Sequence, residues 1–265
     1  MSDRTVRRIL LEDLNFHHYK MVLVQAINDK DIVNRKTLCE FLLNALDNDV
    51  LNHVLVTDEA NFHLCGNVSS QNSCYWATEN PRDIHQKPLL SEKVIVWCGV
   101  TSFGVIGPYF FEDGAGRAVT VNSARYTEML CTFLEPQLQR RGVETQTLWF
   151  QQDGATAHTV RTAMWVLNEM FPAHVISRRG NIKWPARSHD LNTCDFFLWG
   201  YLKSKVEEKK PRTTVDLKQN IRDEVAAVPP TMLQRMVQNF QKCLRECVDN
   251  KGRHLTDTLF RKWIL

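Results

Sequence analysis

The chain has 265 residues, of which 43% are hydrophobic and 24% are charged, and its net charge is +3 at pH 7. This composition is typical of a globular protein with one large domain, alone or with an appendage, and it excludes a disordered or collagen-like chain. No apolar run approaches the roughly 20 residues of a bilayer crossing, and MSDRTVRRIL lacks the apolar stretch of a secretory signal, so we expect an intracellular protein with no membrane contact.

The N-terminal segment has a mostly helical pattern. Residues 4–10, RTVRRIL, place apolar side chains on one side of a short helix and basic side chains on the other. The basic side chains are Arg4, Arg7 and Arg8. Helical spacing continues from residue 13 to about residue 45, which predicts a linker helix that leads into the main domain.

From residue 51 the period of the hydrophobic pattern is two. Val54, Val56 and Asp58 fall on one face of a predicted strand, LNHVLVTDEANF. A second strand is predicted at 73–77, and two more in KVIVWCGVTS and GVIGPYFFED, joined by a turn around Phe103 and Gly104. These strands form an antiparallel meander.

Helices and short strands alternate in the rest of the chain. After the meander we predict a helix SARYTEMLCTFLEPQLQRR, a strand TLWFQQD, a helix TVRTAMWVLNEMF and a short strand near HVIS. A loop, RRGNIKWPARSHDLNT, then precedes a run of helices. A meander, a crossover helix and a strand of parallel type predict an α/β fold with a mixed sheet flanked by helices.

The eight cysteines form no CxxC pair and no zinc-finger spacing, so we interpret them as reduced thiols.

The segment 178–212 holds nine Lys or Arg against four Asp or Glu, a local excess of five positive charges. Basic side chains in such excess ordinarily form a solvent-exposed face of the protein. The net charge of the whole chain is too small to indicate nucleic-acid binding by itself.

Asp58 and Asp153 each come at the end of a predicted strand. Ligands of open α/β sheets collect outside strand ends, so we expect the two carboxylates to converge. Close carboxylates repel each other, so one is protonated or a cation lies between them, and oxygen ligands suit Mg²⁺ or Mn²⁺. Taken singly, each aspartate is more often a turn former or helix cap, and Asp153 before Gly154 is a common turn pair.

Three motifs in order resemble those of the mariner-like transposases of the Tc/mariner superfamily. They are TDEANF at 57–62, QQDGATAH at 151–158 and WPARSHDLNTCDFFLWGYLKSKV at 184–206, and the resemblance extends over nearly the whole chain. It implies a ribonuclease-H-like catalytic domain at 47–265. It also implies that 1–46 is a remnant of a helix-turn-helix DNA-binding region with a linker helix, in an N-terminally truncated copy.

The resemblance carries the catalytic and metal-binding roles onto Asp58, Asp153 and Asp195, with two Mg²⁺ or Mn²⁺ ions. The implied reaction is cleavage at element ends followed by transfer of the freed 3′-hydroxyl to target DNA. The implied partner is double-stranded DNA, both transposon ends and target, for a nuclear protein that forms a homodimer. We then interpret nine basic residues as DNA contacts. They are Arg4, Arg7, Arg8, Arg178, Arg179, Lys183, Arg187, Lys203 and Lys205.

Within the third motif we prefer Asp195 to Asp190 as the ligand. A cap at Asn192 or Thr193 puts Asp195 in the first turn of a helix, where the helix dipole favours negative charge. His158 could contact a phosphate, orient an aspartate, cap a turn or pack in the wall, and we disfavour it as a metal ligand.

Glu59 points to the opposite strand face from Asp58, and we interpret it as structural. We assign six aromatic residues to the core rather than to a base-stacking platform. They are Trp97, Trp149, Phe150, Phe196, Phe197 and Trp199.

The third motif departs from the family, because His189 and Thr193 stand where prolines are usual. We expect their loss to loosen the loop before Asp195. One alternative is therefore a decaying or host-retained derivative that binds DNA without catalysis. Another alternative is a glycoside hydrolase that uses paired carboxylates, but the order of the three motifs disfavours it.

Overall fold

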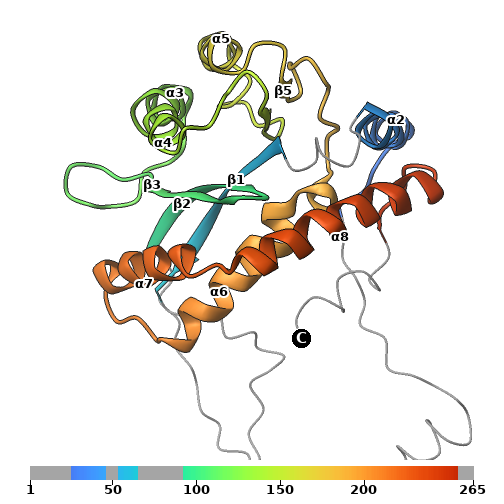
Figure 1. The fold of residues 1–265 in the computed structure, drawn as a ribbon. Helices are drawn as coiled ribbons and strands as arrows, with labels where there is room; N and C mark the ends of the chain where they lie inside the picture. The colour runs from blue at the N-terminus through green and yellow to red at the C-terminus, as the bar shows by residue number, and fades with distance from the viewer. Residues whose placement is uncertain (1–24, 46–52, 65–91, 256–265) are drawn as a thin grey trace, which may run out of the picture.

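The computed structural model describes residues 25–45, 53–64 and 92–255. In this part of the chain, a five-stranded sheet has the strand order β3-β2-β1-β4-β5 and is covered by helices on both faces (Figure 1). β1 pairs antiparallel with β2, which pairs antiparallel with β3, whereas β1, β4 and β5 run parallel. The strands are β1 (Val54–His63), β2 (Lys93–Thr101), β3 (Gly104–Phe110), β4 (Trp149–Gln151) and β5 (Val175–Ile176).

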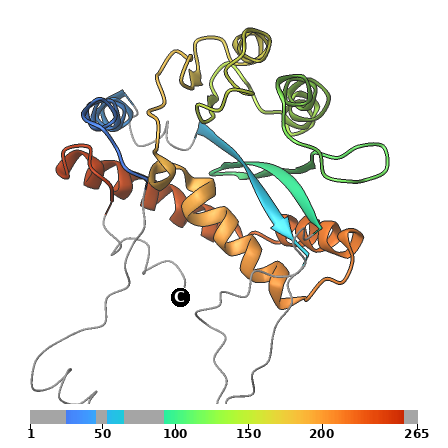
Figure 2. The ribbon, with the colours of Figure 1, turned by 180° about the vertical axis from the view of Figure 1, so that it is seen from behind.

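Two groups of helices cover the two faces of this sheet, as Figure 2 shows from behind. One face carries α3 (Ser123–Met129), α4 (Glu135–Arg140) and α5 (Arg161–Met170), and a π-helical segment, Leu130–Leu134, joins α3 to α4. On the other face lie α6 (Trp199–Glu208), α7 (Thr214–Ala226) and α8 (Pro230–Asp249), while α2 (Asp29–Ala45) packs against α8 to one side of the sheet. The mixed sheet flanked by helices that the sequence predicts is confirmed.

Each face of the sheet has its own hydrophobic core, because successive strand residues point to opposite sides. Val54 and Val56 of β1 belong to the core shared with α2, α6, α7 and α8. Leu55, between them, belongs to the core shared with α3, α4 and α5, together with Trp97 and Phe150. Both cores therefore follow from the alternating pattern of the strand segments.

The predicted elements from residue 92 onward are present in the predicted order. The predicted helix at 4–10 and strand at 73–77 lie outside the described residues. The linker helix is shorter than predicted, because residues 25–28 are not helical and α2 begins at Asp29. Asn28 fixes this start as a capping box: its side-chain oxygen accepts from the Asp31 N–H at 2.9 Å, and Asp31 accepts from the Asn28 N–H at 3.2 Å.

α2 packs against the end of α8 and against the loop of the third motif. The buried Arg35 donates to both carboxylate oxygens of Asp190, at 2.7 and 2.6 Å, and to the carbonyl of Gly252 at 2.9 Å. Gly252 has a φ of 85°, and a Cβ there would lie 2.1 Å from the Ile32 carbonyl oxygen. Only glycine permits this close approach of the chain to α2.

The six cysteines in the described part of the chain are free thiols, as predicted, and five of them are buried. They are Cys39, Cys98, Cys131, Cys194, Cys243 and Cys247. Cys65 and Cys74 lie outside the described residues. In the described ranges, none of the helices combines the length and the apolar character that a membrane crossing requires.

Candidate functional site

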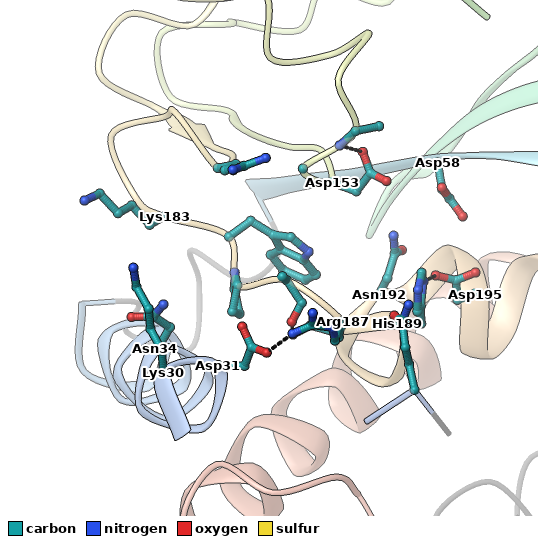
Figure 3. A pocket seen from close by; sticks show the side chains of 18 residues that line it. Lys30, Asp31, Asn34, Asp58, Asp153, Lys183, Arg187, His189, Asn192 and Asp195 are labelled. Carbon is teal, nitrogen blue, oxygen red and sulfur yellow. Dashed lines mark hydrogen bonds and ion pairs between the residues drawn. The ribbon is translucent and has the colours of Figure 1, made fainter. Parts of the chain in front are cut away.

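A cavity of about 740 Å³ lies between α2, the loop of the third motif, the middle of β1 and the end of β4, and three aspartates line it. They are Asp58, Asp153 and Asp195. Figure 3 shows their side chains around the same opening, each from a different sequence motif. The predicted convergence of Asp58 and Asp153 is therefore observed, and Asp195 joins them.

Parallel pairing of β1 with β4 explains why the first two aspartates meet. The pairing runs from Val54 opposite Trp149 to Val56 opposite Gln151, and each aspartate follows two residues after the last pair. The prediction that Asp58 ends its strand is wrong, however. β1 continues to His63 because β2 pairs with it along this length, with Asp58 opposite Cys98. Asp58 therefore lies in the middle of β1, past the residues that pair with β4.

Asp195 is brought to the cavity by the first turn of a helix, as predicted. A π-helical segment, Cys194–Leu198, contains Asp195 and continues directly into α6. The Asn192 side chain accepts from the Cys194 N–H at 2.9 Å, and the Cys194 thiol lies 3.3 Å from the carbonyl oxygen of Val56, to which it donates. The start of this helix is thus attached to β1 two residues before Asp58.

Asp58 is held by a tryptophan that sequence reasoning assigned only to the core. Trp199 is buried, and its Nε1 donates to Oδ2 of Asp58 at 2.9 Å. Burial, followed by the negative charges of Asp195 and Glu59, raises the pKa of Asp58 to about 8, against the effect of the Trp199 hydrogen bond. The carboxylates of Asp195 and Glu59 therefore disfavour a negative charge on Asp58.

Asp153 is held by its own turn and by His158. Its Oδ1 accepts from the Ala155 N–H at 2.9 Å and lies 2.6 Å from Nδ1 of His158. Burial raises the pKa of Asp153, but the hydrogen bond and charge of His158 hold it below its usual value. Of the roles weighed for His158, the structure places it where it orients an aspartate.

Glu59 faces away from Asp58, as predicted, and its side chain contacts His158. Its Oε1 lies 3.2 Å from Nε2 of His158, an ion-pair distance without the alignment of a good hydrogen bond. Burial lowers the pKa of His158, but Glu59 and Asp153 outweigh it and raise this pKa to about 10. Sequence reasoning missed the contact because 99 positions separate the two residues.

His189 is a second residue that sequence reasoning noticed without assigning it a contact. Its Nδ1 lies 3.2 Å from Oδ2 of Asp195, across a 3₁₀ turn formed by His189–Leu191. This hydrogen bond raises the pKa of His189, although partial burial opposes it. The imidazole therefore lies beside the third carboxylate, at the position where the resembled motif has proline.

Asp190 turns away from the other aspartates toward Arg35, which explains why it does not line the cavity. In addition, Arg187 forms an ion pair with Asp31 of α2. Together with the Asn192 cap, these contacts restrain the loop whose usual prolines are absent.

Of the nine basic residues predicted to contact DNA, the six in the described part of the chain do not form one surface. Arg178, Lys183 and Arg187 line the carboxylate cavity, and Lys30 of α2 joins them. Arg179 instead donates to the Thr159 carbonyl at 3.1 Å, and Lys205 pairs with Glu208 at 3.0 Å. Arg4, Arg7 and Arg8 lie outside the described residues.

A second cavity of about 930 Å³ lies beside α6 and the part of β1 that extends beyond its pairing with β4, and Asp195 borders this cavity as well. Lys203, predicted to contact DNA, lines it with its ammonium group 5.8 Å from the centre of the Phe62 ring. Glu59 and Glu207 line it too, so its charge is mixed.

In the ranges 25–45, 53–64 and 92–255, no three His, Cys, Asp or Glu side chains already surround a point where a metal ion would sit. The three aspartates nevertheless supply the hard oxygen donors that Mg²⁺ and Mn²⁺ prefer. The hydrogen bonds from Trp199, His158 and His189 each use one oxygen of a carboxylate. The donor set is thus compatible with these ions.

No protein-family model matches the sequence, and no curated protein matches it. Solved structures do match the fold. A Mos1 transposase paired-end complex with left transposon end has a TM-score of 0.78 at 21% sequence identity, over 97% of this chain and 72% of that chain. The catalytic domain of Mos1 mariner transposase has a TM-score of 0.67 at 22% identity, over 89% of this chain and 100% of that chain. The chain therefore has the ribonuclease-H-like fold of a mariner transposase catalytic domain, as its motifs predict.

Proposed function

We propose that the chain is the catalytic region of a mariner-like transposase, which cleaves DNA and joins the freed 3′ end to a target. The observation that carries this proposal is that Asp58, Asp153 and Asp195, from three separate motifs, line one cavity. The fold shared with the Mos1 catalytic domain supports the same conclusion.

The three aspartates would hold the divalent ions, each through the carboxylate oxygen that its hydrogen-bond partner does not use. Repulsion among these partly buried carboxylates disfavours their joint ionisation, and a bound cation would relieve it. Structures of the Mos1 catalytic domain with Mg and with Mn are among those that share the fold. When bound, two such ions supply the Lewis acidity that activates a water or a 3′-hydroxyl and stabilises the leaving oxygen.

The other residues of the cavity would bind and orient the DNA backbone. Lys30, Arg178 and Lys183 line the same cavity as the aspartates, and phosphate contacts from such side chains provide most sequence-independent affinity for DNA. His158, Trp199 and His189 would keep the carboxylates in place, because each contacts one of them. Double-stranded DNA is therefore the proposed partner.

Nicking of supercoiled plasmid DNA in Mn²⁺ tests this proposal. We expect nicking by the wild type, none after chelation, and none by Asp58→Asn, Asp153→Asn or Asp195→Asn. Asp113→Asn is a matched control, because Asp113 lies in the loop after β3, where it pairs with Arg117 and does not line the cavity. Nicking that survives all three cavity substitutions would refute the proposal, and DNA binding without nicking would favour a non-catalytic derivative.

A further inference from the structure

Two largely buried ionisable residues form a chain of contacts with Asp153: His158 contacts Asp153, and Glu59 contacts His158. The side chain of His158 is 6% exposed and that of Glu59 is 15% exposed, whereas that of Asp153 is 39% exposed. Burying a charged group without a partner is costly, so each of these residues depends on the other. Neither His158 nor Glu59 lines the carboxylate cavity itself.

The imidazole of His158 lies between two carboxylates. Nδ1 is 2.6 Å from Oδ1 of Asp153, and Nε2 is 3.2 Å from Oε1 of Glu59. The ring therefore presents one nitrogen to each carboxylate, with Nδ1 at hydrogen-bond distance from Asp153 and Nε2 at ion-pair distance from Glu59. A rotation of the ring would remove both contacts at once, which fixes the direction of Nδ1 toward Asp153.

The ring is also held from the side and through the backbone. The Tyr126 ring lies against it, with 4.1 Å between the ring centres. The Tyr126 hydroxyl donates to Oε1 of Gln152 at 2.6 Å, and Nε2 of Gln152 donates to the backbone carbonyl of His158 at 3.1 Å. The position of His158 is therefore set by buried groups on α3, β1 and the end of β4.

We propose that Glu59 is a positioning residue for the second carboxylate: it holds His158, which in turn holds Oδ1 of Asp153 and leaves Oδ2 to bind a divalent ion. This inference rests on the proposed function, since it concerns metal binding by Asp153. It also assigns a role to the glutamate that directly follows the first aspartate. The two neighbours on β1 then serve the site from opposite faces of the sheet, Asp58 from one face and Glu59 from the other.

Mn²⁺ affinity, measured by calorimetry, separates positioning from a purely structural role. We expect Glu59→Gln and His158→Gln each to weaken Mn²⁺ binding by about 10- to 100-fold, the usual effect of removing a group that orients a metal ligand. Because Glu59 acts through His158, the double variant should bind no more weakly than His158→Gln alone. Glu207→Gln is the control for loss of a nearby negative charge, since Glu207 lines the second cavity together with Glu59, and we expect unchanged affinity.

The outcomes distinguish this inference from the proposed function. Wild-type protein that binds no Mn²⁺ would overturn both. Wild-type binding with unchanged affinity in Glu59→Gln, or with losses that multiply in the double variant, would overturn the positioning role alone. If Glu59→Gln does not fold, Glu59→Asp, which keeps the charge but shortens the side chain, replaces it: weakened Mn²⁺ binding supports the positioning role, and unchanged binding contradicts it.

Discussion

Arg35 of α2 and Asp190 of the third motif form a buried, bidentate salt bridge. Its two hydrogen bonds measure 2.7 and 2.6 Å, and the Arg35 side chain has no exposed surface. The bridge joins residues 155 positions apart and connects the helix before the sheet to the loop that leads into Asp195. α2 is thereby part of the wall of the carboxylate cavity rather than a free linker.

Removing Arg35 should destabilise the fold strongly. Arg35→Met leaves the largely buried Asp190 without its charged partner on α2, with the Leu255 N–H as a remaining donor at 3.1 Å, and breaking such a pair costs about 3–5 kcal/mol of unfolding free energy. Urea denaturation measures this loss. Lys36→Met is the control, because Lys36 is the adjacent residue of α2 and makes only an exposed pair with Glu40, so its change should stay below about 1 kcal/mol. Equal effects of the two substitutions would contradict the structural role of the bridge.

The same bridge predicts loss of stability in acid. Burial raises the pKa of Asp190, but the hydrogen bonds and charge of Arg35 hold it below its usual value. A carboxylate with a lowered folded-state pKa stabilises the protein above its unfolded pKa of about 3.9, and this contribution is lost as the pH falls through the folded value. Urea midpoints should therefore fall steeply below about pH 4 in the wild type and less steeply in Asp190→Asn. If the urea midpoints of the wild type and of Asp190→Asn fall equally with pH, the Arg35–Asp190 bridge is not the cause of the acid sensitivity.

Metal binding should release a proton from Asp58. Burial and the charges of Asp195 and Glu59 raise the pKa of Asp58 to about 8, so the metal-free protein holds this proton at neutral pH. A cation competes with the proton, and Mn²⁺ affinity should rise with pH until Asp58 is ionised. Calorimetry in buffers of different ionisation enthalpy measures the release. An affinity that does not change between pH 6 and pH 9 would show that Asp58 is not protonated in the free protein.

DNA affinity should depend on the basic residues of the cavity and not on the whole basic segment. Lys183→Ala removes a cavity residue, and we expect weaker binding together with a decrease of about 1 in the slope of log K against log salt concentration. Lys205→Ala is the matched control, because Lys205 pairs with Glu208 and does not line the cavity. Fluorescence anisotropy with duplex DNA at several salt concentrations measures both. If Lys205→Ala has the larger effect, DNA lies elsewhere.

The sequence predicts the parts of the site that depend on local pattern. Alternating residues of β1 predict its strand and the face of Asp58, and the cap before Cys194 predicts the helix that carries Asp195. The apolar run LWF predicts β4, although the strand ends at Gln151, two residues before the predicted end at Asp153. Each of these features is decided within a few residues, where strand period and helix capping act.

Contacts between distant segments could not be predicted in the same way. Trp199 reads as a core residue, and its hydrogen bond to Asp58 depends on how α6 crosses β1, 141 positions away. The predicted end of the first strand is wrong because the hydrophobic pattern does not reveal how far each neighbouring strand pairs with β1. β2 pairs with β1 as far as His63, whereas β4 pairs with it only as far as Val56. The bond from His189 to Asp195 is local, but it needs a 3₁₀ turn where the resembled motif has proline.

Mn²⁺ titration by calorimetry, on the wild type and on Asp58→Ala, Asp153→Ala and Asp195→Ala, tests the central claim most directly. The claim is that the three aspartates lining one cavity bind divalent metal together. We predict binding by the wild type that each substitution weakens strongly, with Asp113→Ala unchanged. Equal binding by the wild type and all three cavity variants, or no binding by the wild type with or without DNA, would contradict it.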